Sequence, residues 1–270
     1  MYHKSSNAAV PFGTSGVIVT CDGGKERGAA RDVARNLREA YERRFGTKDV
    51  AQSDGRKDIE DELENELASL REDAKKPMFK ECALDLRAST FLAFDAGENK
   101  ECSIADLVHD ELERAMESRE TRGRHVLRML PVDVVCFAGL DEIIDAAKGL
   151  VAKHFSSEKE QTFAISFERR ANNSVERGEV IKAIADMIKQ PPNKVNLGNP
   201  DVTIMVEVIK GVACLSVVRD YERLCKYNLR MVAMTEDERE HAKRVLNGNK
   251  NPPAHRAKED DEVAPKDDDE

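Results

Sequence analysis

The sequence predicts an α+β protein built from two successive domains, and three observations lead to this prediction. Short β-branched runs, such as residues 16–21 and 202–209, alternate with longer segments whose apolar residues recur every three or four positions. Over the first half of the chain the elements follow the order β-α-β-β-α-β, which is the ferredoxin-like arrangement. The second half follows the order α-β-α-β-β and therefore forms an α/β domain of its own.

The first domain is expected over residues 14–138. Within it we expect strands at 16–21, 78–86, 90–94 and 126–138, and helices at 30–45 and 103–116. Gly46 stands where a helix C-cap belongs, and Ser103 opens a capping-box-like start. Pro131 lies inside the last expected strand, so it marks a bulge or an edge position, because proline cannot donate to a ladder of hydrogen bonds.

The second domain has its core at 139–221, with a start near residue 122 as the alternative. We expect helices at 143–155 and 179–189, and strands at 162–167, 202–209 and 212–218. Phe163, Ile165 and Phe167 alternate with smaller or polar residues, as in a half-buried strand. The last two strands meet at Lys210-Gly211, which is a plausible hairpin turn.

The negative net charge of -9 is concentrated in two segments. Ten acidic and three basic residues lie between Asp49 and Asp73, and twelve acidic and seven basic residues lie between Glu236 and Glu270. We interpret residues 49–76 as an acidic insertion and residues 235–270 as a disordered acidic tail, since neither buries enough apolar surface to fold alone. The remaining chain is mildly basic, so its charge does not exclude a nucleic-acid partner.

Other classes of protein fit the sequence poorly. The first 13 residues have no apolar run behind Lys4, so they do not form a secretory signal. No apolar run reaches the roughly 20 residues that a membrane helix needs, and no membrane partner is expected. The six cysteines are scattered without a CxxC pair, which favours free thiols in a reducing compartment over a metal site.

Catalytic motifs are also missing from the sequence. It contains no GxSxG, HExxH or Walker-type motif, and no GxGxxG follows a strand. The glycine-rich turn Asp22-Gly23-Gly24-Lys25 precedes a helix and could receive an anion, but the signal is weak and we favour a plain strand-to-helix turn. We therefore predict no catalytic residue, no metal ligand and no cofactor.

Basic and amide side chains near strand ends are the more informative feature. Guanidinium groups match phosphate oxygens, whereas a lone surface lysine is more often only solvated. Such side chains lie just before the strand expected at 126–138 and just after the strand expected at 162–167. Others lie on the helix expected at 179–189, in the loop that follows it, and in the last stretch before the polar tail. We predict an RNA-binding surface formed by Arg122, Arg124, Arg128, Arg169, Arg170, Asn172, Lys182, Lys194, Asn196 and Lys226.

The second domain resembles a THUMP domain. The resemblance rests on residues 163–173 (FAISFERRANN), which carry arginines at a strand end, and on residues 177–185 (RGEVIKAIA), which open a helix. The turn at 195–201 (VNLGNPD) completes the pattern, with Asn196 where the family more often has Asp. Together these motifs cover about a hundred residues, in the family's order.

The wider chain resembles the eukaryotic THUMP-domain adaptor family that supports tRNA cytidine acetylation. The shared stretches are GVIVTCDGGK at 16–25, FKEC at 79–82, RMLPVDVVC at 128–136 and KYNLR at 226–230. The resemblance implies a non-catalytic adaptor that binds serine and leucine tRNAs. It further implies a partner RNA cytidine acetyltransferase that makes N(4)-acetylcytidine in the D arm, and a location in the nucleus or nucleolus, with the cytoplasm in addition. No DNA partner is expected.

Two other interpretations of the sequence stay open. Many THUMP proteins carry a catalytic domain, so the chain could belong to an RNA-modifying enzyme. However, the stretch after Arg230 is too short and too polar for such a domain. A protein-interaction scaffold with an incidental basic surface is the third interpretation, and it predicts no binding of tRNA at low salt.

Overall fold

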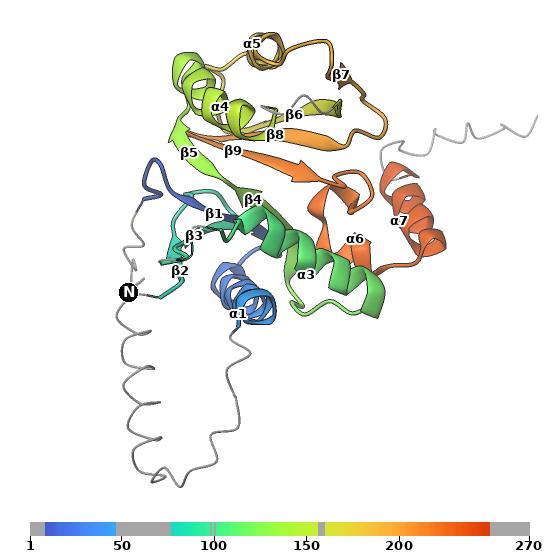
Figure 1. Cartoon of the computed structure of the whole chain (residues 1–270). Coiled ribbons are helices and arrows are strands. Elements are labelled where there is room, and N and C mark those ends of the chain that lie inside the picture. Colours follow the sequence, from blue (N-terminus) through green and yellow to red (C-terminus); the bar gives the residue numbers. More distant parts are fainter. Residues whose placement is uncertain (1–8, 47–76, 98, 100, 156–159, 249–270) are drawn as a thin grey trace, which may run out of the picture. The chain divides into compact units, whose positions relative to one another are not determined.

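A computed structural model describes residues 9–46, 77–97, 99, 101–155 and 160–248 (Figure 1). The acidic insertion expected at 49–76 lies outside these residues, as does the tail from 249 onward. The chain divides into one unit that ends at Met234 and a second that starts at Thr235. Among the described residues, no helix is long and apolar enough to span a membrane.

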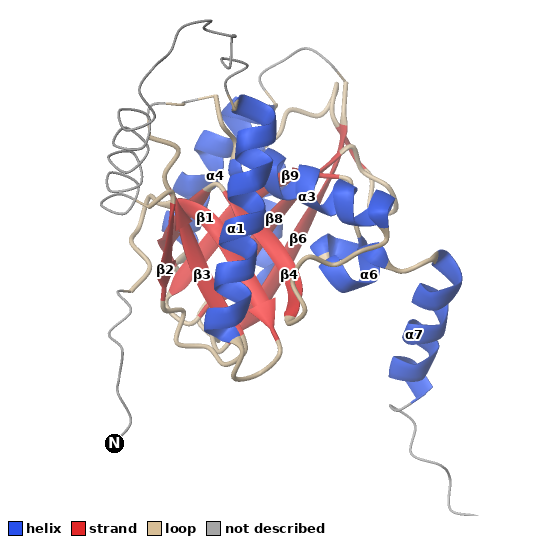
Figure 2. Cartoon of the chain, turned by 90° about the horizontal axis from the view of Figure 1, so that it is seen from below, coloured by secondary structure: helices blue, strands red, loops and turns tan. Residues whose placement is uncertain are grey.

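The first sheet has the strand order β2-β3-β1-β4, and every pairing in it is antiparallel. Its helices α1 and α3 pack on one face of the sheet, and Figure 2 shows α1 lying across the strands. This order and chain path confirm the ferredoxin-like arrangement. The elements are β1 Ser15–Cys21, α1 Glu26–Phe45, β2 Phe79–Cys82, β3 Ser89–Phe94, α3 Ile104–Ser118 and β4 Val126–Val132.

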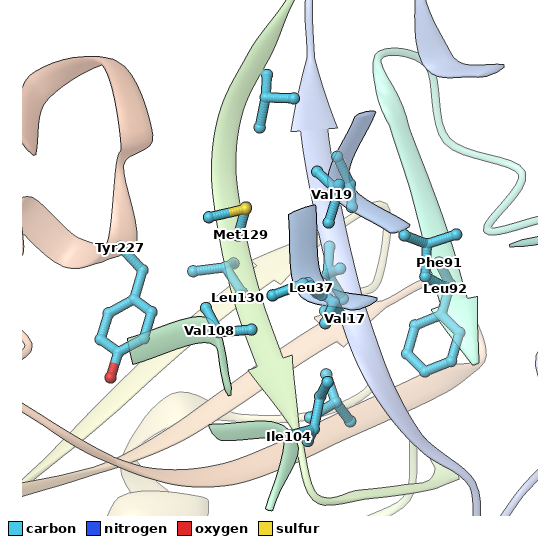
Figure 3. Packing of buried hydrophobic residues seen from close by; sticks show 14 of the residues in the cluster. Val17, Val19, Leu37, Phe91, Leu92, Ile104, Val108, Met129, Leu130 and Tyr227 are labelled. Carbon is cyan, nitrogen blue, oxygen red and sulfur yellow. The ribbon is translucent and has the colours of Figure 1, made fainter. Parts of the chain in front are cut away.

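The core of this domain follows from the apolar periodicity of its helices. Leu37 of α1 and Val108 of α3 are fully buried, and they pack toward Val17 of β1 and Leu130 of β4 (Figure 3). The same cluster of buried residues continues into one face of the second sheet, at Met205, Ile209, Cys214 and Val218. One of the two hydrophobic cores therefore extends across both domains.

The second sheet has the order β5-β9-β8-β6-β7, with β6 parallel to β7 and β8 and the other pairings antiparallel. Helices α4 and α5 pack together over a separate core that contains Ile143, Phe163 and Ile184. The expected hairpin at Lys210-Gly211 is confirmed. The elements are β5 Val134–Phe137, α4 Leu140–His154, β6 Thr162–Arg170, α5 Arg177–Met187, β7 Lys194–Val195, β8 Val202–Ile209 and β9 Val212–Arg219.

The single strand expected at 126–138 is in fact two strands that belong to different sheets. Asp133 separates them, and its carboxylate accepts hydrogen bonds from Ser216 Oγ (2.7 Å) and from the backbone N–H of Val217 (3.1 Å). These two hydrogen bonds hold the half-buried carboxylate in place. The backbone is therefore fixed at Asp133, where the chain passes from β4 into β5. The edge position expected for Pro131 is confirmed, because β4 is the last strand of its sheet.

After β9 the chain returns to the first domain. The short helices η1 (Cys225–Tyr227) and α6 (Leu229–Ala233) pack against β4, and α6 also packs against α3. Tyr227 is fully buried and donates from its hydroxyl to the carbonyl of Arg219 (3.0 Å), while Asn228 caps α6 by accepting from the N–H of Met231 (3.1 Å). The KYNLR stretch thus has a structural role that the sequence alone did not reveal.

The tail expected to be disordered from Thr235 instead begins with helix α7, Glu236–Gly248. Its start is a capping box, because Thr235 Oγ1 accepts from the N–H of Glu238 (3.3 Å) and the Glu238 carboxylate accepts from the N–H of Thr235 (2.8 Å). Acids in the first turn, such as Glu236 and Asp237, also favour the helix N-terminus. The capping box and the acidic first turn therefore favour a helix here, although the segment has a polar composition.

Candidate nucleic-acid interface

The two sheets meet at a pocket that is rich in arginine. It has a volume of about 380 Å³, and Arg87, Arg128, Arg170 and Asn228 line it together with the ends of β1 and β3. We call these four residues and their cavity the arginine pocket. Arg87 and Arg128 come from the first domain and Arg170 from the second, so neither domain forms the pocket alone.

Each side chain reaches the arginine pocket for a local reason. Arg128 pairs with Thr20 of β1, next to a register shift between Thr20 and Cys21, and it forms an isolated bridge with Asn228. Arg87 lies in the connection between β2 and β3 and passes Gly23, where an added Cβ would stand 3.4 Å from its Nε. The Arg87 side chain thus lies in van der Waals reach of the glycine-rich turn.

Strand alternation separates the two neighbouring arginines at the end of β6. Arg170 lies on the same face as Ser166 and Glu168, toward the first domain, and lines the arginine pocket. Arg169 lies on the opposite face, where it donates to the carbonyl of Val175 (3.1 Å). The pair that the sequence suggested as one cluster is thus divided between two surfaces.

The arginine pocket carries excess positive charge. Arg87, Arg128 and Arg170 form no ion pair with any other residue in the described part of the chain. The nearby carboxyl groups are Glu26, which interacts with Arg87, and the pair Glu207 of β8 and Glu168 of β6, which stand in register on the sheet face that carries Arg170. Glu207 is 3% exposed. Burial raises the pKa of Glu207 to about 7, although Arg170 and Arg128 act to lower it. The pocket can therefore bind an anion such as a phosphate.

Two other predicted residues precede β4. Arg122 forms an ion pair with Glu39 of α1 (2.6 Å), and its backbone carbonyl accepts from Asn36 Nδ2 (2.5 Å). Its side chain is thus engaged in joining the α3–β4 connection to α1. Arg124 is exposed, and its carbonyl accepts from Arg230 (3.0 Å), so its guanidinium group is the part that faces solvent.

Two predicted amides close local turns. Asn172 donates to the carbonyl of Lys210 (2.7 Å) and accepts from the N–H of Ser174 (3.0 Å), so it holds the β6–α5 loop. Asn196 accepts from the N–H of Gly198 (3.0 Å) and donates to the carbonyl of Asn199 (2.9 Å). The side chain of Asn196 therefore holds the turn at 195–201 in shape.

The predicted lysines lie on exposed surfaces outside the arginine pocket. Lys182 is exposed on α5, and Lys194 forms an ion pair with Glu160. Lys226 pairs with Glu222 (3.6 Å) and lines a second groove of about 170 Å³ beside β6. Arg177 and the 79%-exposed Leu197 line that groove as well. Because Glu168 lines this groove and lies on the same face of β6 as Arg170, the groove and the arginine pocket share one side of the sheet.

Three residues that line the arginine pocket or the second groove had not been predicted as RNA contacts. Arg177 and Leu197 both belong to the THUMP-like motifs but were not predicted as contacts. Arg87 stands in a short connection without any motif, and only the folded chain brings it beside Arg128 and Arg170.

The glycine-rich turn at Asp22-Gly23-Gly24-Lys25 is already occupied by a side chain of this protein. The Glu26 carboxylate accepts from the N–H groups of Gly24 (3.2 Å) and Ala88 (2.9 Å), and these bonds hold its pKa below the usual range. Asp22 pairs with Arg230 (2.6 Å) and His125 (3.1 Å). The plain-turn interpretation therefore accounts for the motif.

One group of side chains has the composition of a metal site. His109, Glu113 and Asp220 lie close enough together to share an ion. However, Arg223 pairs with Glu113 and with Asp220 (3.0 Å), so the carboxylates are already compensated. His109 Nε2 lies 2.9 Å from Asp220, and the group thus joins α3 to the segment after β9.

The second domain defines the class of protein, because the THUMP domain family model matches residues 137–218. The chain is 31% identical to THUMP domain-containing protein 1 of Mus musculus over 250 residues, which cover 86% of this chain and 68% of the mouse protein. The protein therefore belongs to the family of THUMP domain-containing protein 1, as the sequence resemblance indicated.

Two further relatives add to this placement. THUMP domain-containing protein 1 of Bos taurus is 31% identical over 82% of this chain, and the chain spans 63% of the bovine protein. The protein named tRNA acetyltransferase TAN1 of Saccharomyces cerevisiae is 26% identical, over 85% of this chain and 88% of the yeast protein. The solution structure of the THUMP domain of THUMP domain-containing protein 1 is 38% identical over 30% of this chain and 84% of that domain, with a TM-score of 0.28.

Proposed function

We propose that this protein is a tRNA-binding adaptor that presents tRNA to a separate RNA cytidine acetyltransferase. The observation that carries the proposal is the arginine pocket, in which both domains contribute unpaired guanidinium groups to one cavity. Guanidinium forks suit phosphate oxygens, and contacts to the backbone position an RNA without reading its sequence. Membership of the THUMP domain-containing protein 1 family supports an RNA partner.

The name of the yeast relative supports acetylation as the modification. It also raises the alternative that this chain transfers the acetyl group itself. Five of the six cysteines are poor candidates for a thiol nucleophile, because burial raises the pKa of Cys21, Cys102 and Cys136 to about 11 and raises those of Cys82 and Cys214 as well. We therefore favour the adaptor, with the acetyl-CoA chemistry on the partner enzyme.

The finer parts of the proposal come from the family resemblance. They are the choice of serine and leucine tRNAs, N(4)-acetylcytidine in the D arm as the product, and the nucleus as the location. A double-stranded arm exposes little base identity in its accessible groove, so recognition by shape and backbone suits a surface made of arginines.

A binding experiment tests the role of the arginine pocket. The variant Arg128→Gln/Arg170→Gln removes two of its charges, and the exposed pair Lys148→Gln/Lys153→Gln on α4 is the matched control. The dissociation constant of a serine tRNA transcript is measured over a series of salt concentrations. We expect the pocket variant to lower the log-log salt slope by roughly 0.7 to 0.9 per lost phosphate contact, and the control to leave it unchanged. An unchanged slope in the pocket variant would contradict the assignment.

The adaptor role is tested by deleting the gene and measuring N(4)-acetylcytidine in serine and leucine tRNAs, with ribosomal RNA as the internal control. We expect loss from the tRNAs alone. Purified protein is then incubated with acetyl-CoA and tRNA in the absence of other proteins. Acetylation of the tRNA in that mixture would identify this chain as the enzyme and refute the adaptor.

A further inference from the structure

A row of exposed arginines runs along α1. Arg27, Arg31, Arg35 and Arg38 are separated by four, four and three residues, so they lie on one face of the helix. All four are exposed, whereas the opposite face buries Val33 and Leu37 in the core. We call these four residues the α1 arginine row. None of them belongs to the buried core of the domain.

The charges of this row are only partly compensated. Arg35 pairs with Asp32 at 3.2 Å, but its side chain is 60% exposed, and an exposed pair of this kind has little effect on stability. Arg31 and Arg38 form no ion pair with any residue that the structure describes. A helix face that keeps several solvated guanidinium groups side by side repels itself, which favours a polyanion as its occupant.

The row begins next to the arginine pocket. Lys25, Arg27 and Arg31 line a cavity of about 570 Å³ at the start of α1, and Ser89 lines both this cavity and the arginine pocket. Gly23, two residues before Lys25, stands against Arg87 of the pocket.

Three acids line the same cavity. Glu26 is bonded to the backbone N–H groups of Gly24 and Ala88, Glu81 accepts from Thr90 Oγ1 (3.4 Å), and Asp85 is exposed. These acids offset the charges of Lys25, Arg27 and Arg31 within the cavity. The cavity therefore joins the two basic surfaces in space, and the excess positive charge lies in the arginine pocket and farther along α1.

The dimensions of the row suit the backbone of a nucleic acid. Arg27 and Arg38 are eleven positions apart, which corresponds to about 16 Å along a helix. Neighbouring side chains at this spacing have Cβ atoms roughly 5 to 6 Å apart, so the row presents a series of donors along one face of the helix. A series of this length can contact several successive phosphates of one RNA strand.

We propose that the α1 arginine row is a second RNA-contacting surface, along which the phosphate backbone of a helical RNA arm lies after it leaves the arginine pocket. The inference rests on the proposed function and assigns the first domain a direct share in RNA binding. An acidic protein is the other class of partner that could cover the row. Continuity with the arginine pocket favours RNA, because one polyanion then occupies both surfaces.

The experiment uses the full chain and the variant Arg31→Gln/Arg38→Gln, with Lys148→Gln/Lys153→Gln as the matched control. Glutamine is a good helix former and both arginines are exposed, so circular dichroism and the urea midpoint are expected to stay at their original values. With a full serine tRNA transcript, we expect the log-log salt slope to fall by about 1.4 to 1.8 in the row variant. We expect no change in the control.

A second ligand separates the two surfaces. Inorganic phosphate is a single small anion that contacts one surface at a time, so its affinity for the arginine pocket should fall in Arg128→Gln/Arg170→Gln and stay unchanged in the row variant. If the row variant keeps the original slope with full tRNA while the pocket variant loses it, the row is not an RNA contact, although the proposed function stands. If the unchanged protein does not bind tRNA at all, the proposed function itself fails.

A pull-down with the acetyltransferase covers the remaining alternative. Loss of the enzyme by the row variant, together with unchanged tRNA affinity, would assign the row to the protein partner and overturn the RNA proposal. Retained association with a reduced salt slope is the result that we expect.

Discussion

Changing Glu207 to Gln tests the electrostatics of the domain interface. Glu207 is 3% exposed and lies on the face of the second sheet that shares a core with the first domain. Burial raises its pKa from 4.5 to about 7. Each pKa unit corresponds to about 1.4 kcal/mol, so the unprotonated carboxylate destabilises the folded protein by about 3 kcal/mol relative to the protonated form.

The sign follows from where the proton is bound. Between pH 4.5 and pH 7 the folded protein holds a proton on Glu207 that the unfolded chain has lost, so the free energy of unfolding falls as the pH rises through this window. Above pH 7 Glu207 is ionised in the folded protein as well, so the free energy of unfolding has fallen by the full amount. Glutamine does not titrate, so the free energy of unfolding of the variant does not fall with pH on account of residue 207. At pH 8 the variant should therefore be more stable than the original protein, by up to about 3 kcal/mol.

Urea denaturation at several pH values between 4.5 and 8 measures the difference between the two proteins. Comparing them at each pH cancels the titration of every other group, provided that the variant perturbs none of them. Glu179→Gln, on the exposed side of α5, controls for the substitution itself. A stability difference that stays constant over the whole range would refute the reasoning, because it would mean that Glu207 titrates alike in the folded and unfolded chains.

Two further changes test the packing of the first domain, with urea denaturation as the measurement in both. Leu37 is fully buried between α1 and the sheet, so Leu37→Ala should lower the free energy of unfolding by about 2 to 5 kcal/mol, and a loss below about 1 kcal/mol would mean that α1 packs differently. Tyr227→Phe removes the donor to the Arg219 carbonyl, and we expect a loss of about 1 kcal/mol; an unchanged stability would show that water replaces this bond.

Much of the fold could be predicted from sequence periodicity. The strands at 16–21 and 202–209 and the helices that contain Leu37 and Ile184 all lie where alternation or helical spacing placed them. The division of 126–138 into β4 and β5 could not be predicted, because it depends on Asp133 meeting Ser216, which is 83 residues away in the sequence. The two-residue strand β7 is too short to leave a pattern.

The site was only partly visible in the sequence, for a different physical reason. Arg128 and Arg170 could be proposed because guanidinium groups at strand ends suit phosphates, and they do line one pocket. Arg122 and Asn172 looked equivalent, yet Glu39 and the carbonyl of Lys210 engage them. Residue type does not reveal which partner a side chain will find in the folded protein. The spacing of the α1 arginine row, in contrast, was available in the sequence and was overlooked.

The junction at Asp133 has a consequence for how the protein meets its ligand. One residue separates β4 from β5, and hydrogen bonds to β9 hold that residue, so the chain has no slack where it passes from one sheet to the other. A hinge needs residues that are free to change their backbone angles, and this connection has none to spare. The strands that carry Arg128 and Arg170 therefore keep a fixed separation. Under the proposed function, a binding surface that needs no domain movement loses little conformational freedom when RNA binds.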